Sequence, residues 1–217
     1  MNKTLSFLKL DYVTLRPYLS IKNLVIMLAA SSLFTIESST TPIAIFMMYG
    51  FIFSSYCFAA GDKCDIDELY VSLSISRNSV VTGRYLFILL LNLCFGILAY
   101  ASALLIPLFL HKSNEPKEAL FMTLILFFVL SFFNLMQLPV FFKLGYAKGK
   151  VKAYTPLIVL AFLLVLISRY LKDAVAPVTS WIAENRALSI SAAILIWMLA
   201  IWISRKVALL FYEKRDF

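Results

Sequence analysis

The segment Gly145-Tyr-Ala-Lys-Gly-Lys150 has the composition of a phosphate-binding loop. A nucleotide-binding P-loop has four residues between its two glycines, and a Ser or Thr that binds magnesium follows its lysine. Here three residues separate Gly145 from Gly149, and Val151 follows Lys150. We therefore expect a flexible, basic turn at this position and no ATP binding by this segment.

Nucleophilic and metal-assisted catalysis also lack their usual residues. The chain has one histidine, His111, whereas an H-E-x-x-H zinc site requires two. No G-x-S-x-G segment occurs. His111 is also poorly placed to activate a serine of an apolar segment, such as Ser31, Ser54 or Ser131. We predict no catalytic residue, no metal site and no cofactor bound by this chain.

Three amide side chains lie within apolar segments: Asn92, Asn134 and Gln137. In membrane helices such residues most often form hydrogen bonds between helices, and this is the use we expect. They are also candidate polar residues of a translocation path. Because Ser131, Asn134 and Gln137 are spaced by three residues, they share one helix face, which leaves an intramembrane enzyme as the alternative.

Composition predicts the elements that carry these residues. Of the 217 residues, 62% are hydrophobic and 15% are charged, whereas soluble domains are roughly 45–50% apolar and about 25% charged. An all-α membrane protein of one domain, residues 1–217, is therefore predicted. Six stretches have the length and apolarity of a membrane span, with every charged residue outside their interiors: 21–37, 41–60, 85–110, 119–142, 153–170 and 187–204.

Lysine and arginine set the predicted orientation, because cytoplasmic loops of membrane proteins carry an excess of both. Fifteen of the 20 lie in the N-terminal arm, the loops 61–84 and 143–152, and the C-terminal tail. Both termini are therefore predicted to be cytoplasmic. The net charge of +8 then lies on the cytoplasmic face, where anionic lipid headgroups are the expected partner and nucleic acid is not.

Residues 1–20 are predicted to form an amphipathic interfacial helix. Its apolar stripe has spacings of three and four residues, and Lys9, Asp11 and Arg16 lie off the stripe. The stripe consists of Leu5, Leu8, Tyr12, Leu15 and Leu19.

The loop 61–84 is the longest predicted cytoplasmic segment and is too short for a catalytic domain. Asp65 and Glu68 have the spacing of a helix capping box. Leu69, Tyr70 and Leu73 then give a short helix one apolar face with an exposed aromatic side chain. This helix is either a docking element for a cytosolic partner or a connector packed on its own chain.

The motifs around this loop resemble those of a known family. Leu73-Ser-Ile-Ser-Arg77, followed by Gly83-Arg84-Tyr85, resembles the Leu-Pro-Ile-Ser-Arg…Gly-Arg/Lys-Tyr signature of small bacterial ABC-2 type permeases. Ser74 stands where that family usually has proline. The segments Pro139–Gly149, Lys9–Asp11 and Tyr212–Phe217 are also similar to the family, so the resemblance extends along essentially the whole chain.

The resemblance implies a six-helix permease in the bacterial cytoplasmic membrane, paired with a second copy or a paralogue and with separate cytosolic ATPase subunits that bind ATP and magnesium. In such permeases the loop between spans two and three is the coupling helix that contacts the ATPase, and the N-terminal arm is an elbow helix. The elbow residues are then Leu8, Tyr12 and Leu15. The coupling residues are then Asp65, Asp67, Glu68, Leu69, Tyr70, Leu73 and Arg77.

Within the family, the sequence is most similar to phenol-soluble-modulin exporters of Gram-positive bacteria, which implies outward transport of amphipathic peptides and antimicrobial-peptide resistance. Spans without charge also favour an apolar or amphipathic substrate. The outer segment 171–187 is either an interfacial loop anchored by Trp181 or a lid. The alternatives to a permease are a lipid-modifying or proteolytic intramembrane enzyme, and a non-catalytic immunity or scaffold protein.

Overall fold

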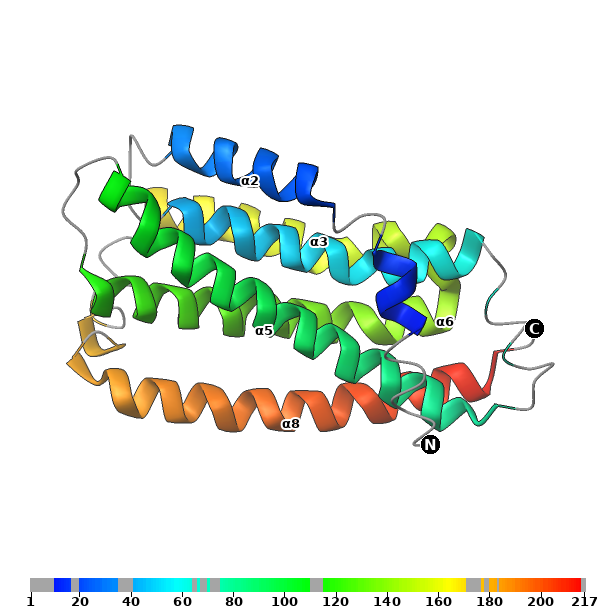
Figure 1. Ribbon diagram of the computed structural model, residues 1–217. Helices are drawn as coiled ribbons and strands as arrows, with labels where there is room; N and C mark the ends of the chain where they lie inside the picture. Colours follow the sequence, from blue (N-terminus) through cyan, green and yellow to red (C-terminus); the bar gives the residue numbers. More distant parts are fainter. Residues whose placement is uncertain are drawn as a thin grey trace.

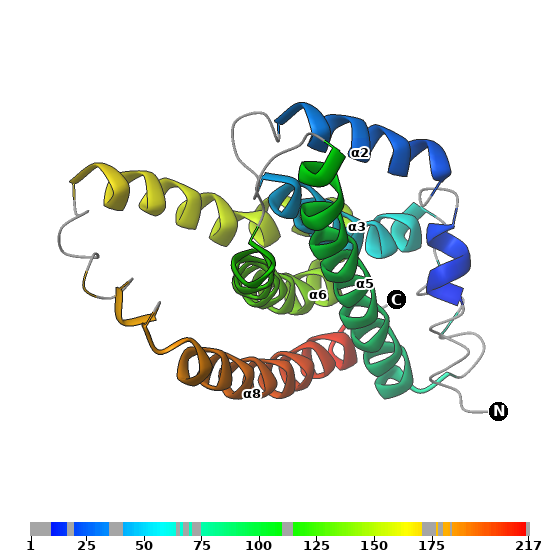
Figure 2. The ribbon, with the colours of Figure 1, turned by 60° about the vertical axis from the view of Figure 1, so that its left-hand side comes forward.

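The computed structural model describes residues 10–16, 20–34, 41–63, 66, 70, 75–109, 115–170, 177, 180–182 and 184–215. Residues 10–15 are helical, and five longer helices follow: α2 (Ile21–Phe34), α3 (Thr41–Lys63), α5 (Arg77–Phe109), α6 (Pro116–Tyr170) and α8 (Arg186–Glu213). The described residues contain no β-strand. Figures 1 and 2 show the helices as a bundle in which α2 lies over α3.

The sequence explains where α6 begins and where it bends. Pro116 occupies its first position, where a missing N–H costs nothing, and Glu118 lies in its first turn, next to the positive end of the helix dipole. A straight helix of 55 residues would be about 80 Å long, far more than the roughly 30 Å of a bilayer core. Gly145, with φ 71° and ψ 174°, breaks the helix. We call the parts before and after Gly145 the first and second arms; Figure 1 shows the second arm running back from the bend, behind α3 in this view.

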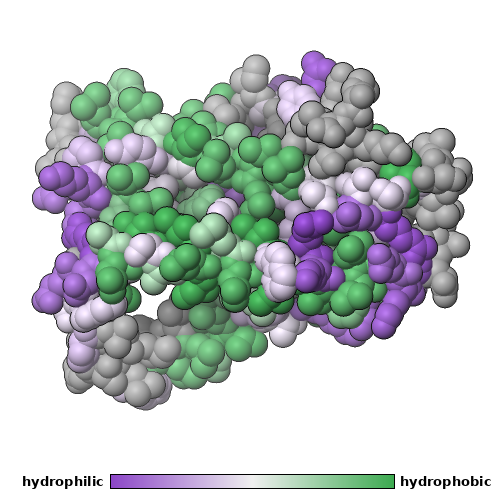
Figure 3. Space-filling model, turned by 90° about the horizontal axis from the view of Figure 1, so that it is seen from below, coloured by the Kyte–Doolittle hydropathy of each residue, from purple (hydrophilic) through white to green (hydrophobic). Residues whose placement is uncertain are grey.

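Four of the described helices are long and apolar enough to cross a membrane: Thr41–Lys63, Arg77–Phe109, Pro116–Leu163 and Arg186–Glu213. The helix α2 has 14 residues, or about 21 Å, and residues 35–40 beyond it lie outside the described residues. Since α6 has two arms, the chain can accommodate the six predicted spans, but the count of six stays a prediction. Figure 3 shows an apolar band across the middle of one face, with polar residues at both ends.

Helix ends extend beyond several predicted spans. The third span was expected to begin at residue 85 and the sixth to end at residue 204, whereas α5 begins at Arg77 and α8 ends at Glu213. The predicted spans stopped at charged residues, and the helices continue past them: α5 has Arg77 and Arg84 in its extra turns, and α8 has Arg205 and Lys206. Ser76 directly precedes α5, and its carbonyl accepts a hydrogen bond from the Val80 amide.

Aromatic side chains form the core where α3, α5, α6 and α8 meet. The Phe58 ring of α3 lies 5.1 Å from the rings of both Phe141 and Phe142 of α6, measured between centroids. Phe142 also stacks on Tyr85 of α5 and meets the Tyr212 ring of α8 edge-on. Because one cluster joins four helices, their relative positions at this depth are tightly linked.

The N-terminal helix contains one feature that the pattern did not predict. Asp11, expected off the apolar stripe, is only 3% exposed, because it has a cationic partner in α5, Arg84. Of the predicted elbow residues, Leu15 is buried in the protein, Tyr12 is 51% exposed, and Leu8 lies outside the described residues. The interfacial position of this helix stays a prediction.

Close packing of α3 on α5 gives a first prediction. A Cβ at Gly50 would lie 2.8 Å from Cβ of Phe95, which is closer than real contacts allow. We expect Gly50→Ala to reduce the free energy of unfolding by about 1–3 kcal/mol, because an overpacked core must distort. Denaturant titration of the protein in micelles, followed by circular dichroism, measures the change.

Gly61→Ala on the same helix is the matched control. The Cβ added there would meet only Nη1 of Arg84, at an ordinary 3.8 Å. Equal stability losses in the two variants would contradict the close α3–α5 packing.

Candidate functional site

One end of the bundle holds four of the predicted functional residues that the structure describes: Tyr12, Leu15, Tyr70 and Arg77. The helix of residues 10–15, the end of α3, the start of α5, the bend of α6 and the end of α8 all lie there (Figure 1). We call it the terminal end. The predicted coupling residues Asp65, Asp67, Glu68, Leu69 and Leu73 lie outside the described residues, so only Tyr70 and Arg77 of that set have a described position.

Tyr70 faces into the protein. Its side chain is 3% exposed, so the expected exposed aromatic is wrong at this residue. It lines a small cavity of about 110 Å³ together with Ile75, Arg77, Val80 and Tyr212. The Ile75 amide also donates to the Tyr70 carbonyl. Tyr70 therefore joins the loop to α5 and α8.

Arg77 is directed at the end of α8. Its Nη1 donates to the carbonyl of Tyr212 at 3.0 Å and to that of Glu213. The last carbonyls of a helix have no partner within the helix and carry its negative dipole end, so a guanidinium stabilises them. Nearby, Nη2 of Arg205 donates to Oδ1 of Asn78 at 3.0 Å. Two arginines thus join the start of α5 to α8.

A buried ion pair joins the N-terminal helix to α5. Nη2 of Arg84 lies 3.1 Å from Oδ1 of Asp11, and both side chains are about 5% exposed or less. The guanidinium also lies over the Phe58 ring of α3, 4.8 Å from its centroid. A carboxylate and a guanidinium at this depth are tolerated only as partners, because each alone would have lost its hydration. The pair therefore links three helices.

The bend of α6 is held by an aspartate of α3. Oδ2 of Asp62 accepts a hydrogen bond of 2.9 Å from the Ala147 amide, which is one of the unpaired amides at the beginning of the second arm. A Cβ at Gly145 would lie 2.9 Å from the same Asp62 oxygen. Of the two glycines that suggested a phosphate loop, Gly145 forms this bend, where a turn was predicted, and Gly149 lies within the helix of the second arm.

Of the three amide side chains predicted to form hydrogen bonds between helices, Asn92 and Asn134 do so. Nδ2 of Asn134 donates to Oδ1 of Asn92 at 3.1 Å, so these buried residues connect α6 to α5. Gln137 is buried without a hydrogen-bonding partner for its amide group in the described structure. Ser131 accepts from Nε1 of Trp197 on α8 at 2.7 Å. Ser131 and Asn134 of α6 thus contact different helices, α8 and α5.

A polar contact that sequence reasoning missed lies between α6 and α8. The Ser204 hydroxyl donates to the Leu135 carbonyl and hydrogen-bonds Tyr85 at 2.6 Å. Pro139 has no N–H, so the carbonyl four residues before it has no partner within the helix, and Ser204 fills that role. Pro139 was the available signal, but the identity of the donor depends on how the helices pack.

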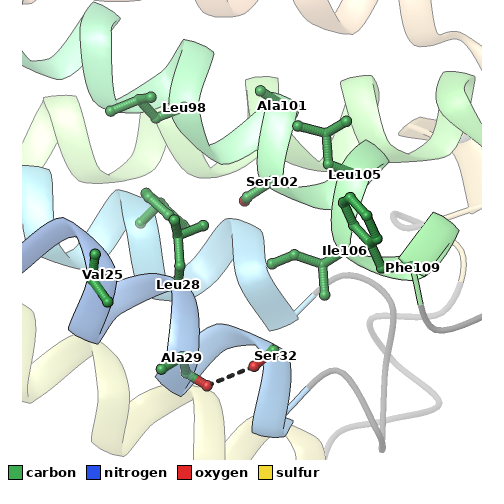
Figure 4. A pocket seen from close by; sticks show the side chains of 11 residues that line it. Val25, Leu28, Ala29, Ser32, Leu98, Ala101, Ser102, Leu105, Ile106 and Phe109 are labelled. Atoms are coloured by element: carbon green, nitrogen blue, oxygen red, sulfur yellow. Dashed lines mark hydrogen bonds between the residues drawn. The ribbon is translucent and has the colours of Figure 1, made fainter.

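At the opposite end, an apolar pocket of about 630 Å³ opens between α2 and α5, with Phe46 of α3 also lining it. Figure 4 shows the side chains of α2 and α5 on facing walls. Its two hydroxyls donate to carbonyls of their own helices, Ser32 to Ala29 and Ser102 to Ala99. The walls therefore suit a hydrocarbon group, and the volume is typical of a small-molecule site.

The chain is similar to a known protein family over nearly its whole length. A family model described as ABC-2 family transporter protein matches residues 7–213, nearly the whole chain. The chain belongs to the ABC-2 transporter family. No curated protein and no solved structure gives a significant match.

Family membership and the apolar helices together describe a multi-pass membrane protein that forms the membrane component of an ABC transporter. In this family the ATPase is a partner subunit. The terminal end of this ABC-2 protein holds the α3–α5 loop and is therefore the candidate interface with that subunit. The finer subgroup expected from the sequence remains a prediction.

Proposed function

We propose that this ABC-2 protein is the permease subunit of an exporter that moves amphipathic molecules, with peptides as the leading class. The observation that carries the substrate class is the 630 Å³ pocket between α2 and α5, whose walls are almost wholly apolar. A hydrocarbon face of an amphiphile gains stability there at about 25 cal/mol per Å² removed from water.

Several further parts of the proposal follow from the sequence. The basic residues favour cytoplasmic termini in a bacterial plasma membrane, so outward movement begins at the terminal end. ATP and magnesium belong to the partner ATPase, and a second copy or a paralogue completes the membrane pore. The similarity to phenol-soluble-modulin exporters supports an amphipathic peptide as cargo and a role in antimicrobial-peptide resistance.

An intramembrane enzyme is the weaker alternative. Its candidate residues Ser131 and Asn134 bind Trp197 of α8 and Asn92 of α5, respectively. Both side chains therefore hold the bundle together, which fits a permease. A scaffold or immunity protein differs from the exporter in having no ATP-driven flux.

The pocket gives a direct test of the substrate class. The complex of this chain with its ATPase is reconstituted in phosphatidylethanolamine–phosphatidylglycerol vesicles, and ATP-dependent uptake of a fluorescent amphipathic helical peptide is measured. We expect Ala101→Trp to reduce uptake at least tenfold, because an indole fills the wall of the pocket and removes contacts worth over about 1.4 kcal/mol.

Ala161→Trp is the matched control, because Ala161 is exposed on the second arm of α6 and does not line this pocket. Its uptake should equal that of the unmodified complex. Equal uptake by the two variants would contradict the pocket as the substrate site. A complex that moves no peptide with ATP would contradict the proposed substrate.

A further inference from the structure

The loop between α3 and α5 ends at Arg77, a residue that hydrogen-bonds to α8. Arg77 is the first residue of α5, and it donates to the carbonyls of Tyr212 and Glu213 in the last turn of α8. These two stretches are more than 130 positions apart in sequence. A displacement of the loop end would therefore move the end of α8, because the Arg77 guanidinium is hydrogen-bonded to its carbonyls.

Arg77 is poorly suited to contact a cytosolic protein directly. Its side chain is half-buried, its guanidinium is engaged with α8, and it lines the same small cavity as Tyr70 and Tyr212. Two of the predicted coupling residues, Tyr70 and Arg77, thus point into the bundle instead of away from it.

Two further contacts extend the link. Tyr212 is 1% exposed, and its ring lies 5.3 Å from that of Phe142, which precedes the bend of α6. Farther along α8, Ser204 binds both the Leu135 carbonyl and the Tyr85 hydroxyl. A shift of the α8 end therefore reaches the part of α6 near Pro139 and the body of α5.

We infer that Arg77 is a positioning residue that transmits movement of the α3–α5 loop to α8, and not a contact with the ATPase. The inference rests on the proposed function, since it requires a partner whose ATP cycle moves the loop. The contact is rigid enough for this role because a guanidinium presents fixed, planar donors to neighbouring carbonyl oxygens.

The test follows α8 during the ATP cycle in the complex of the full chain with its ATPase. Nitroxide labels are placed at Leu210→Cys on α8 and Val129→Cys on α6, both exposed in the unmodified chain, with Cys64 and Cys94 replaced by serine. The distance between the labels is measured before and after trapping with magnesium, ATP and vanadate.

We expect trapping to shift the label distance in the parent complex. Arg77→Gln should lose most of that shift while the ATPase stays bound and keeps hydrolysing ATP. Arg77→Lys keeps a donor cation and should retain part of the shift. Lys63→Gln, an exposed cation at the other end of the loop, should leave the shift unchanged.

A second measurement checks the contact itself. In Arg77→Gln, amide hydrogen exchange in the last turn of α8 should rise roughly tenfold, the effect of losing a charge-assisted hydrogen bond. This readout needs no partner and shows whether the variant is otherwise folded.

Three results would overturn the inference. An unchanged label shift in Arg77→Gln shows that α8 moves without this contact. Release of the ATPase by Arg77→Gln makes Arg77 a docking residue. Failure of the parent chain to bind any ATPase overturns the proposed function and the inference with it. The first two results, in contrast, overturn the inference and leave the proposed function standing.

Discussion

Arg84→Met is expected to lower the free energy of unfolding by about 3–5 kcal/mol, the usual cost of leaving one member of a buried ion pair without its partner. The Asp11 carboxylate would stay buried without the guanidinium that now lies 3.1 Å away. Methionine fills much of the volume of the arginine side chain. The expected loss of stability therefore comes from the unpaired Asp11 charge and not from a cavity. Unfolding in micelles, followed by tryptophan fluorescence, measures the effect.

Two controls make this prediction specific. Arg16→Met removes an exposed arginine near the same N-terminal helix and should change stability by less than about 0.5 kcal/mol. The double variant Asp11→Leu with Arg84→Met should be more stable than Arg84→Met alone, because no charge then remains buried. A double variant that is no more stable would show that the pair is not what holds the N-terminal helix in place.

Gly145→Ala is expected to be the next most damaging change, with a loss on the order of 2–4 kcal/mol from backbone strain and a weakened helix cap. The residue has φ +71°, and the added Cβ would lie 2.9 Å from Oδ2 of Asp62. That oxygen binds the Ala147 amide, so relieving the clash disturbs the start of the second arm.

Gly149→Ala is the matched variant four residues away. It is helical, and its added Cβ would make ordinary contacts of 3.4–3.5 Å, so its stability should be equal or higher by up to about 1 kcal/mol. The same unfolding titration compares the two. A larger loss in Gly149→Ala than in Gly145→Ala would mean that the bend is not at Gly145.

Local patterns in the sequence predicted the features of this structure that depend on neighbouring residues. Apolar runs located the helices, a turn was expected at Gly145, and Asn92 and Asn134 were expected to join helices. Each depends on residues close in sequence or on a general preference of the bilayer.

Pairings between distant segments were not predictable in the same way. Asp11 and Arg84 are 73 positions apart; Asp11 was expected off the apolar stripe of the N-terminal helix, and no local pattern linked it to Arg84. Tyr70 was expected to be exposed because it belongs to a polar loop, yet it packs under Arg77 and Tyr212. Such outcomes depend on which helix faces lie opposite each other, which one sequence does not specify.

As the proposed permease subunit, this ABC-2 protein is expected to depend on a separate ATPase subunit for ATP hydrolysis. The most direct measurement is affinity purification of the tagged full chain from its native membrane in mild detergent, followed by an assay of magnesium-dependent ATP hydrolysis. We predict that a protein with Walker motifs co-purifies and hydrolyses ATP, and that the chain separated from it has no ATPase activity. Hydrolysis by the isolated chain, or a transport-active preparation that lacks any ATPase subunit, would contradict the account.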